Sequence, residues 1–98
     1  MVRDFKMLVR EAASRGPKKV AVILPHEKAS IEAINDAQVE GLAEGILIGQ
    51  SNLIAALMKD LKIPLKRFEI RNEKAADQAA EQGVQLALSG AADILLKG

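Results

Sequence analysis

Two stretches of the sequence place residues able to bind or transform a ligand directly after an apolar run. The first is Pro25-His26-Glu27-Lys28, which follows VAVIL at residues 20–24, and the second is Lys97-Gly98, which follows DILL at residues 93–96. A lysine ammonium can hold a phosphate oxygen as a point charge, and a glycine lets the backbone approach a ligand closely. On position alone, Lys97-Gly98 is explained equally well as a cation leaving a sheet for water, followed by a turn glycine.

The remaining polar groups near these runs have structural interpretations that we favour. His26, the single histidine, could be a general base, but no triad or metal partner stands at a fixed spacing, which favours an exposed loop histidine. Glu27 could also be a base, although a carboxylate beginning a helix is stabilised by the helix dipole. Gly49 precedes a helix start whose N–H groups could hold an anion, but a plain turn is the simpler interpretation.

Several kinds of site are excluded by the motifs. The chain contains no cysteine, so it has no thiolate chemistry and no cysteine metal site. The loop PHEKAS matches neither the dinucleotide-binding nor the P-loop glycine pattern. The expected strand ends carry one acid rather than a cluster, so the sequence predicts no metal site and no phosphorylated receiver domain.

The elements that must position these residues alternate regularly. We expect strands at residues 20–24, 46–49, 68–70 and 93–96, and helices at residues 4–15, from 29 to 40, from 51 or 52, and from 72 to 88, with Gly83 packed closely on the sheet. Alternating helices and strands predict βαβ crossovers and a parallel sheet. With right-handed crossovers, the fold class is a three-layer α/β/α sandwich with strand order 3-2-1-4. Both candidate stretches then lie at the carboxyl edge, where such sheets bind ligands.

The last strand presents a physical difficulty. In this order it lies at the sheet edge, yet Ile94, Leu95 and Leu96 are apolar and contain no charge or proline. Stable proteins normally cover or blunt such an edge. We therefore expect a further strand of a longer protein, or a second copy of the chain, to pair with it.

The composition limits the classes of partner that this chain can bind. The 98 residues carry 14 basic and 13 acidic side chains, a net charge of +1, and two aromatic residues. The chain therefore has neither the strong positive potential nor the aromatic stacking surface that binding of nucleic acid requires. Its longest apolar run is also too short to span a membrane. We expect a cytoplasmic domain that binds neither nucleic acid nor membrane.

An ordered series of segments resembles the phosphate acyltransferase family, and the phosphate butyryltransferase branch in particular. GAADILLKG is similar to the family's G-x-ADILMKG, and KKVAVILPHEKASIEAINDAQVEGLAEGILIGQ is similar to its opening strand, helix and ILVG. LKIPLKRFEIRNEKAADQAAEQGVQLALSG is similar to the segment that follows. The resemblance covers nearly the whole chain.

The resemblance implies transfer of an acyl group between coenzyme A and inorganic phosphate, by attack of the coenzyme A thiolate on an acyl phosphate. It implies small-molecule substrates, coenzyme A among them, with no bound cofactor or metal. It also implies a homodimer or larger assembly and a two-domain architecture like that of isocitrate and isopropylmalate dehydrogenases. Residues 1–98 would be a single α/β domain, the amino-terminal portion of such an enzyme.

The resemblance assigns substrate binding to Lys97 and Gly98, which match the family's substrate loop, and to Pro25 and Glu27, which match an acidic segment lining the cleft. The family's catalytic serine, arginine and aspartate belong to a later segment, so we expect no catalytic residue in these 98 residues. Two alternatives stay open. One is a stand-alone binding or dimerisation module without catalysis. The other is a decarboxylating dehydrogenase of the same fold, which would need an acidic metal cluster.

Overall fold

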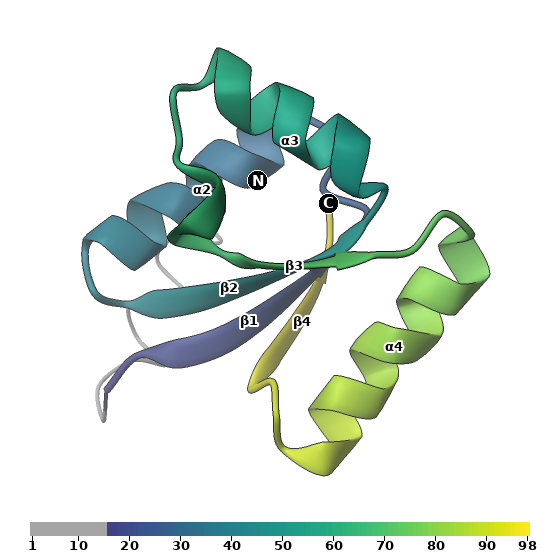
Figure 1. Ribbon diagram of the computed structural model, residues 1–98. Coiled ribbons are helices and arrows are strands. Elements are labelled where there is room, and N and C mark those ends of the chain that lie inside the picture. Colours follow the sequence, from purple (N-terminus) through teal and green to yellow (C-terminus); the bar gives the residue numbers. More distant parts are fainter. Residues whose placement is uncertain (1–15) are drawn as a thin grey trace.

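The structure, a computed structural model, describes residues 16–98, which form a parallel sheet covered by helices on both faces (Figure 1). The helix expected over residues 4–15 lies outside the described residues. The strands are β1 (Lys18–Ile23), β2 (Ala43–Gly49), β3 (Glu69–Asn72) and β4 (Ile94–Lys97). The helices are α2 (Lys28–Val39), α3 (Ser51–Asp60) and α4 (Ala76–Ser89), with a 3₁₀ helix η2 at Leu65–Arg67.

The sheet has the predicted order β3-β2-β1-β4, and every pair of neighbouring strands is parallel. Ile23 is paired with Ile48 of β2 and with Lys97 of β4, so the ends of three strands meet at one carboxyl edge. The fold class is therefore confirmed. The step from β3 to β4 crosses the two central strands, which places β1 and β2 inside the sheet.

Two apolar clusters hold the layers together, one on each face of the sheet. Because successive strand residues point to opposite faces, Val20 and Val22 pack beneath α2 and α3, whereas Ala21 and Ile23 pack beneath α4. This explains why the first strand is apolar without alternation, as is typical of a strand covered on both faces. The larger cluster also contains Ile31, Ile34, Leu47, Ile54, Met58 and Phe68.

Helix α4 approaches the sheet closely at Gly83. A Cβ atom at this position would lie 2.7 Å from the Cδ1 atoms of both Ile23 and Leu95, so the predicted close packing is confirmed. The helix ends at Gly90, which adopts the left-handed conformation with φ of 82°. Glycine is the usual residue at such a helix end because it has no Cβ to clash.

Several boundaries differ from the sequence prediction. Leu24 was assigned to the first strand, but its φ of 53° ends β1 at Ile23. Asn72 was expected to begin the last helix, but it is the final residue of β3, and α4 begins at Ala76. Helix α3 begins at Ser51, as predicted, and its N-cap is Gln50, which makes no side-chain capping hydrogen bond. Asn72 continues β3 because it pairs with Gly49 of β2, a contact between strands that local residue preferences do not report.

The two outer strands differ in character. Strand β3 is short, and its Glu69, Arg71 and Asn72 are exposed. Strand β4 presents Ile94, Leu95 and Leu96, all half-buried, and among the described residues it pairs with β1 alone. The apolar edge anticipated from the sequence is thus present.

Candidate functional site at the carboxyl edge

The loop after β1 is held in an unusual conformation by backbone hydrogen bonds. Leu24 donates its N–H to the carbonyl of Ile48 at 2.8 Å, and its own carbonyl accepts the N–H of His26 at 2.8 Å. Pro25 between them is fully buried. The loop therefore folds back over the end of the sheet as a fixed turn.

Gly98 packs directly on this turn. Its N–H donates to the carbonyl of Ile23 at 2.7 Å, and a Cβ atom on it would lie 2.8 Å from the Pro25 Cα and 2.9 Å from the Leu24 carbonyl oxygen. The structure thus brings two predicted site residues, Pro25 and Gly98, together. Because both contacts are with backbone atoms, no side chain fits at position 98 without moving the turn.

Lys97 and Glu27, the other two predicted site residues, are exposed and lie on opposite faces. Lys97 shares the α4 face of β4 with Leu95 by strand alternation. Glu27 is the N-cap of α2, which covers the other face, and its side chain makes no capping hydrogen bond. Neither side chain forms an ion pair with any of residues 16–98. Both charges remain available to a ligand at this edge.

His26 is not the exposed loop residue that the sequence suggested. Its side chain is half-buried, and Nε2 accepts the backbone N–H of Gln50 at 3.1 Å. Because a backbone amide can only donate, this bond assigns the proton of the neutral ring to Nδ1. The ring also occupies the space beside Gly49, where a Cβ would lie 2.7 Å from Nε2. His26 therefore ties the β1 loop to the start of α3.

Asn72 provides a second tie across the same edge. Its Oδ1 accepts both the N–H and the hydroxyl of Ser51, each at 3.1 Å, and the next residue, Glu73, donates its N–H to the Gly49 carbonyl at 2.7 Å. The amides of Gln50 and Ser51 are thus already satisfied within the protein. This supports the plain-turn interpretation of the residues around Gly49 over an anion site.

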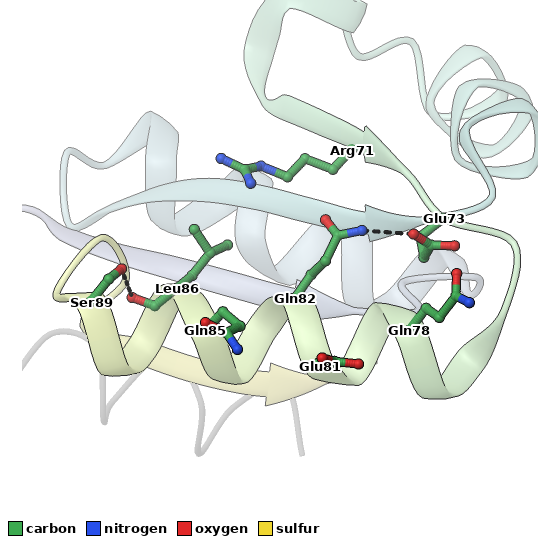
Figure 2. Close-up of a pocket in the computed structure, with 8 residues that line it drawn as sticks. All are labelled: Arg71, Glu73, Gln78, Glu81, Gln82, Gln85, Leu86 and Ser89. Atoms are coloured by element: carbon green, nitrogen blue, oxygen red, sulfur yellow. Dashed lines mark hydrogen bonds between the residues drawn. The ribbon is translucent and has the colours of Figure 1, made fainter.

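A groove of about 500 Å³ lies between β3 and α4 and extends along α4 from Gln78 to Ser89 (Figure 2). Figure 2 shows Arg71 on one side and Gln82 on the other, with Gln82 donating to the Glu73 carboxylate at 2.7 Å. The Arg71 guanidinium is itself paired with Glu69 at 2.6 Å. None of Pro25, Glu27, Lys97 and Gly98 lines this groove.

Residues 16–98 contain no group of three or more histidine, cysteine, aspartate or glutamate side chains arranged to hold a metal ion. None of the helices described there has both the length and the apolar character needed to cross a membrane.

Comparison with known proteins identifies relatives along the whole chain. No protein-family model matches. Phosphate butyryltransferases from Clostridium acetobutylicum and Clostridium beijerinckii are each 33% identical over all 98 residues. The chain spans about a third of the length of these curated relatives, 33% and 32% respectively.

Solved structures agree in fold. A phosphotransacetylase from Streptococcus pyogenes superposes with a TM-score of 0.71 at 21% identity, and covers 100% of this chain with 38% of its own. The EutD phosphotransacetylase from Staphylococcus aureus gives 0.70 at 17% identity, covering 99% of this chain with 38% of its own. The resemblance to phosphate acyltransferases found in the sequence motifs is confirmed.

Proposed function

From the resemblance of this chain to the phosphate acyltransferase family, we propose that it is the amino-terminal part of an enzyme that moves an acyl group between coenzyme A and inorganic phosphate. The observation that carries the proposal is the match of all 98 residues to a third of two phosphate butyryltransferases. In this proposal residues 1–98 form one α/β domain. The rest of a two-domain enzyme, built like isocitrate and isopropylmalate dehydrogenases, supplies the catalytic groups.

In this reaction, the proposed role of the domain is to bind the substrates. The coenzyme A thiolate attacks the carbonyl carbon of an acyl phosphate, the bond to the bridging oxygen breaks, and phosphate leaves with the electron pair. Lys97 is the candidate for holding a phosphate oxygen, because its exposed ammonium lies at the carboxyl edge with no partner among residues 16–98. Such a cation stabilises the charge that develops on the leaving phosphate.

The other three residues have distinct proposed roles. Gly98 lets the ligand approach the backbone at this edge, and Pro25 fixes the turn on which Gly98 packs. Glu27 lines the opposite side of the edge, at the start of α2. We further propose that the complete enzyme is cytoplasmic, binds acyl-CoA and phosphate as its small-molecule partners, and assembles as a homodimer or larger.

The test compares the 98-residue chain with the complete enzyme. The isolated chain should show no phosphate-dependent cleavage of acetyl-CoA or butyryl-CoA, whereas the complete enzyme should show it. Turnover by the pure 98-residue chain would contradict the placement of catalysis outside it. A complete protein inactive on both substrates would contradict the proposed function.

Lys97→Ala in the complete enzyme tests the phosphate contact. We expect the KM for phosphate to rise about tenfold, equivalent to ~1.4 kcal/mol of binding free energy. Lys66→Ala is the matched control, because it removes the same charge from η2, which precedes β3 and lies away from the carboxyl edge. Equal KM values for the Lys97 variant and the parent enzyme would remove Lys97 from the site.

The stand-alone dimerisation module stays a second candidate because β4 has an open apolar edge. The intact mass of the gene product separates the two. A mass much above 10.5 kDa supports the larger enzyme, and a mass of that value supports the module.

A further inference from the structure

His26 joins two loops at the carboxyl edge through one hydrogen bond. Its Nε2 accepts the N–H of Gln50 at 3.1 Å, and Gln50 is the residue between the end of β2 and the start of α3. The imidazole makes no other hydrogen bond or ion pair within residues 16–98. The connection between the β1 loop and the start of α3 therefore depends on Nε2 carrying no proton.

Protonation of the ring removes this connection. In the imidazolium both ring nitrogens are donors, so an Nε2–H would face the Gln50 N–H and the two groups must separate. The ring cannot shift toward β2, because it already fills the space beside Gly49, where a Cβ would lie 2.7 Å from Nε2. Imidazole is also the side chain whose charge ordinarily changes between about pH 5 and 8. The loop is thus tied to α3 in one charge state of the ring and released in the other.

The loop that carries His26 also supports the proposed substrate-binding residues. Pro25 and Glu27 flank the histidine, and Pro25 is fully buried. The position of a Cβ on Gly98 lies 2.8 Å from the Pro25 Cα, so Gly98 rests on the same turn. Because Lys97 directly precedes Gly98, a movement of this turn displaces the ammonium group that is proposed to hold phosphate.

Charged side chains reach this edge from three segments. They are Glu27 and Lys28 at the start of α2, Glu73 and Lys74 in the segment after β3, and Lys97 at the end of β4. The first turn of α3, residues 51–54, carries no charge. Lys28 pairs with Asp60 of α3 at 3.7 Å. Since none of these groups is paired with the imidazole, the bond from Gln50 is the contact within residues 16–98 that distinguishes its two charge states.

We propose that His26 is a positioning residue for phosphate binding, and that it acts only while its imidazole is neutral. The neutral ring holds the β1 loop against α3, and the loop in turn holds Gly98 and Lys97 in place. This contribution is present above the pH range in which imidazoles ordinarily gain a proton, and it is lost as the pH falls through that range. The inference rests on the proposed function, since it takes phosphate as the ligand, and adds the residue that makes its binding depend on pH.

Steady-state kinetics of the complete enzyme test the role of the hydrogen bond. His26→Ala should raise the KM for phosphate about fivefold, the factor that corresponds to one net hydrogen bond, and leave kcat within about twofold. His26→Gln should restore the parent KM, because the amide Oε1 can accept the Gln50 N–H. A histidine that only stabilised the fold would reduce the amount of active enzyme and leave KM unchanged.

The pH profile tests the role of the charge. Between about pH 8 and 5.5, the KM for phosphate should rise about fivefold more in the parent enzyme than in His26→Gln, whose amide does not titrate. The ratio of the two enzymes is the measured quantity, because phosphate itself gains a proton in this range. Asn72→Ala is the matched control. It breaks the other tie at this edge, to Ser51, and keeps the histidine, so it should retain the pH response of the parent.

Nitrogen NMR of isotopically labelled histidine gives a readout that needs no activity. The His26 signals of the complete protein are those that His26→Gln lacks. Two-bond proton–nitrogen correlations at about pH 8 should show the Nδ1–H tautomer, whereas free histidine in water prefers Nε2–H. The Nδ1–H tautomer in a complete protein without acyltransferase activity would support the tie from His26 to Gln50 and refute the proposed function, so the two can fail separately.

Three results would overturn the proposal. They are an Nε2–H tautomer, a KM for phosphate that responds equally to pH in the parent and in His26→Gln, and an unchanged KM in His26→Ala. If His26→Ala does not fold, the comparison of the parent with His26→Gln carries the test.

Discussion

The contact between Gly49 and His26 gives the sharpest test of how the carboxyl edge is built. In Gly49→Ala, the added Cβ would lie 2.7 Å from the His26 Nε2, whereas ordinary contacts of a Cβ are 3.4–4 Å. The imidazole must therefore move by roughly 1 Å. Because Nε2 now sits 3.1 Å from the Gln50 nitrogen, this movement breaks the hydrogen bond and leaves a part-buried N–H without an acceptor.

The expected energies follow from these contacts. The lost hydrogen bond with its unsatisfied donor costs about 1–3 kcal/mol. Replacing glycine by alanine within a strand returns roughly 0.5–1 kcal/mol through reduced backbone entropy of the unfolded chain. Gly49→Ala should therefore lower the free energy of unfolding by about 1 kcal/mol. In a His26→Ala background, with no ring to displace, it should raise that free energy by about 0.5 kcal/mol.

The measurement is a double-mutant cycle by urea unfolding, followed by circular dichroism. We expect a coupling energy of about 1.5 kcal/mol, within the range seen for residues in contact. Gly45→Ala is the control in the same strand, because its Cβ would meet Ile34 and Phe68 and not the histidine. Its effect should be equal in both backgrounds. If Gly49→Ala also changes stability equally in both, the histidine does not occupy the space that makes glycine necessary.

Two further substitutions test the fold that supports the edge, and both are measured by urea unfolding. Asn72→Ala removes the acceptor for the N–H and hydroxyl of Ser51 and should cost about 1 kcal/mol, as loss of a helix cap does; no change in the unfolding midpoint would refute this capping role. Ile54→Ala removes most of a side chain that is 0% exposed and leaves a cavity, so it should lower the free energy of unfolding by about 2–5 kcal/mol. The neighbouring Leu53→Ala, at 42% exposure, should cost less than about 1 kcal/mol, and equal losses for the two would contradict the packing of α3.

The layers of this fold were predictable because they depend on patterns along the chain. The continuous apolar run at residues 20–24 predicts a strand covered on both faces, and the structure places Val20 and Ala21 in different clusters. The crossover rule then orders the strands without any knowledge of contacts. Gly83 was also interpretable, since a glycine inside a helix costs about 1 kcal/mol and close packing on the sheet offsets it.

The details of the site were not predictable, because they depend on side chains meeting across strands. His26 and Gln50 are 24 residues apart, and Ser51 and Asn72 are 21 apart. No local preference relates such pairs. The one available signal was Gly49, which could have suggested that a bulky group lies against the strand end. Asn72 gave no signal, because asparagine before a helical pattern is also a usual helix start.

The four residues that the resemblance assigns to substrate binding divide into two kinds once their contacts are known. Gly98 is explained by packing, because a Cβ atom on it would meet backbone atoms of Leu24 and Pro25, so glycine would be required in this fold even without a ligand. Pro25 is fully buried in the same turn. Lys97 and Glu27 are exposed, and within residues 16–98 their side chains form no hydrogen bond or ion pair. The folded domain gains little from these two charges, since exposed charges contribute little to stability. The ammonium group of Lys97 and the carboxylate of Glu27 are therefore available to bind a ligand.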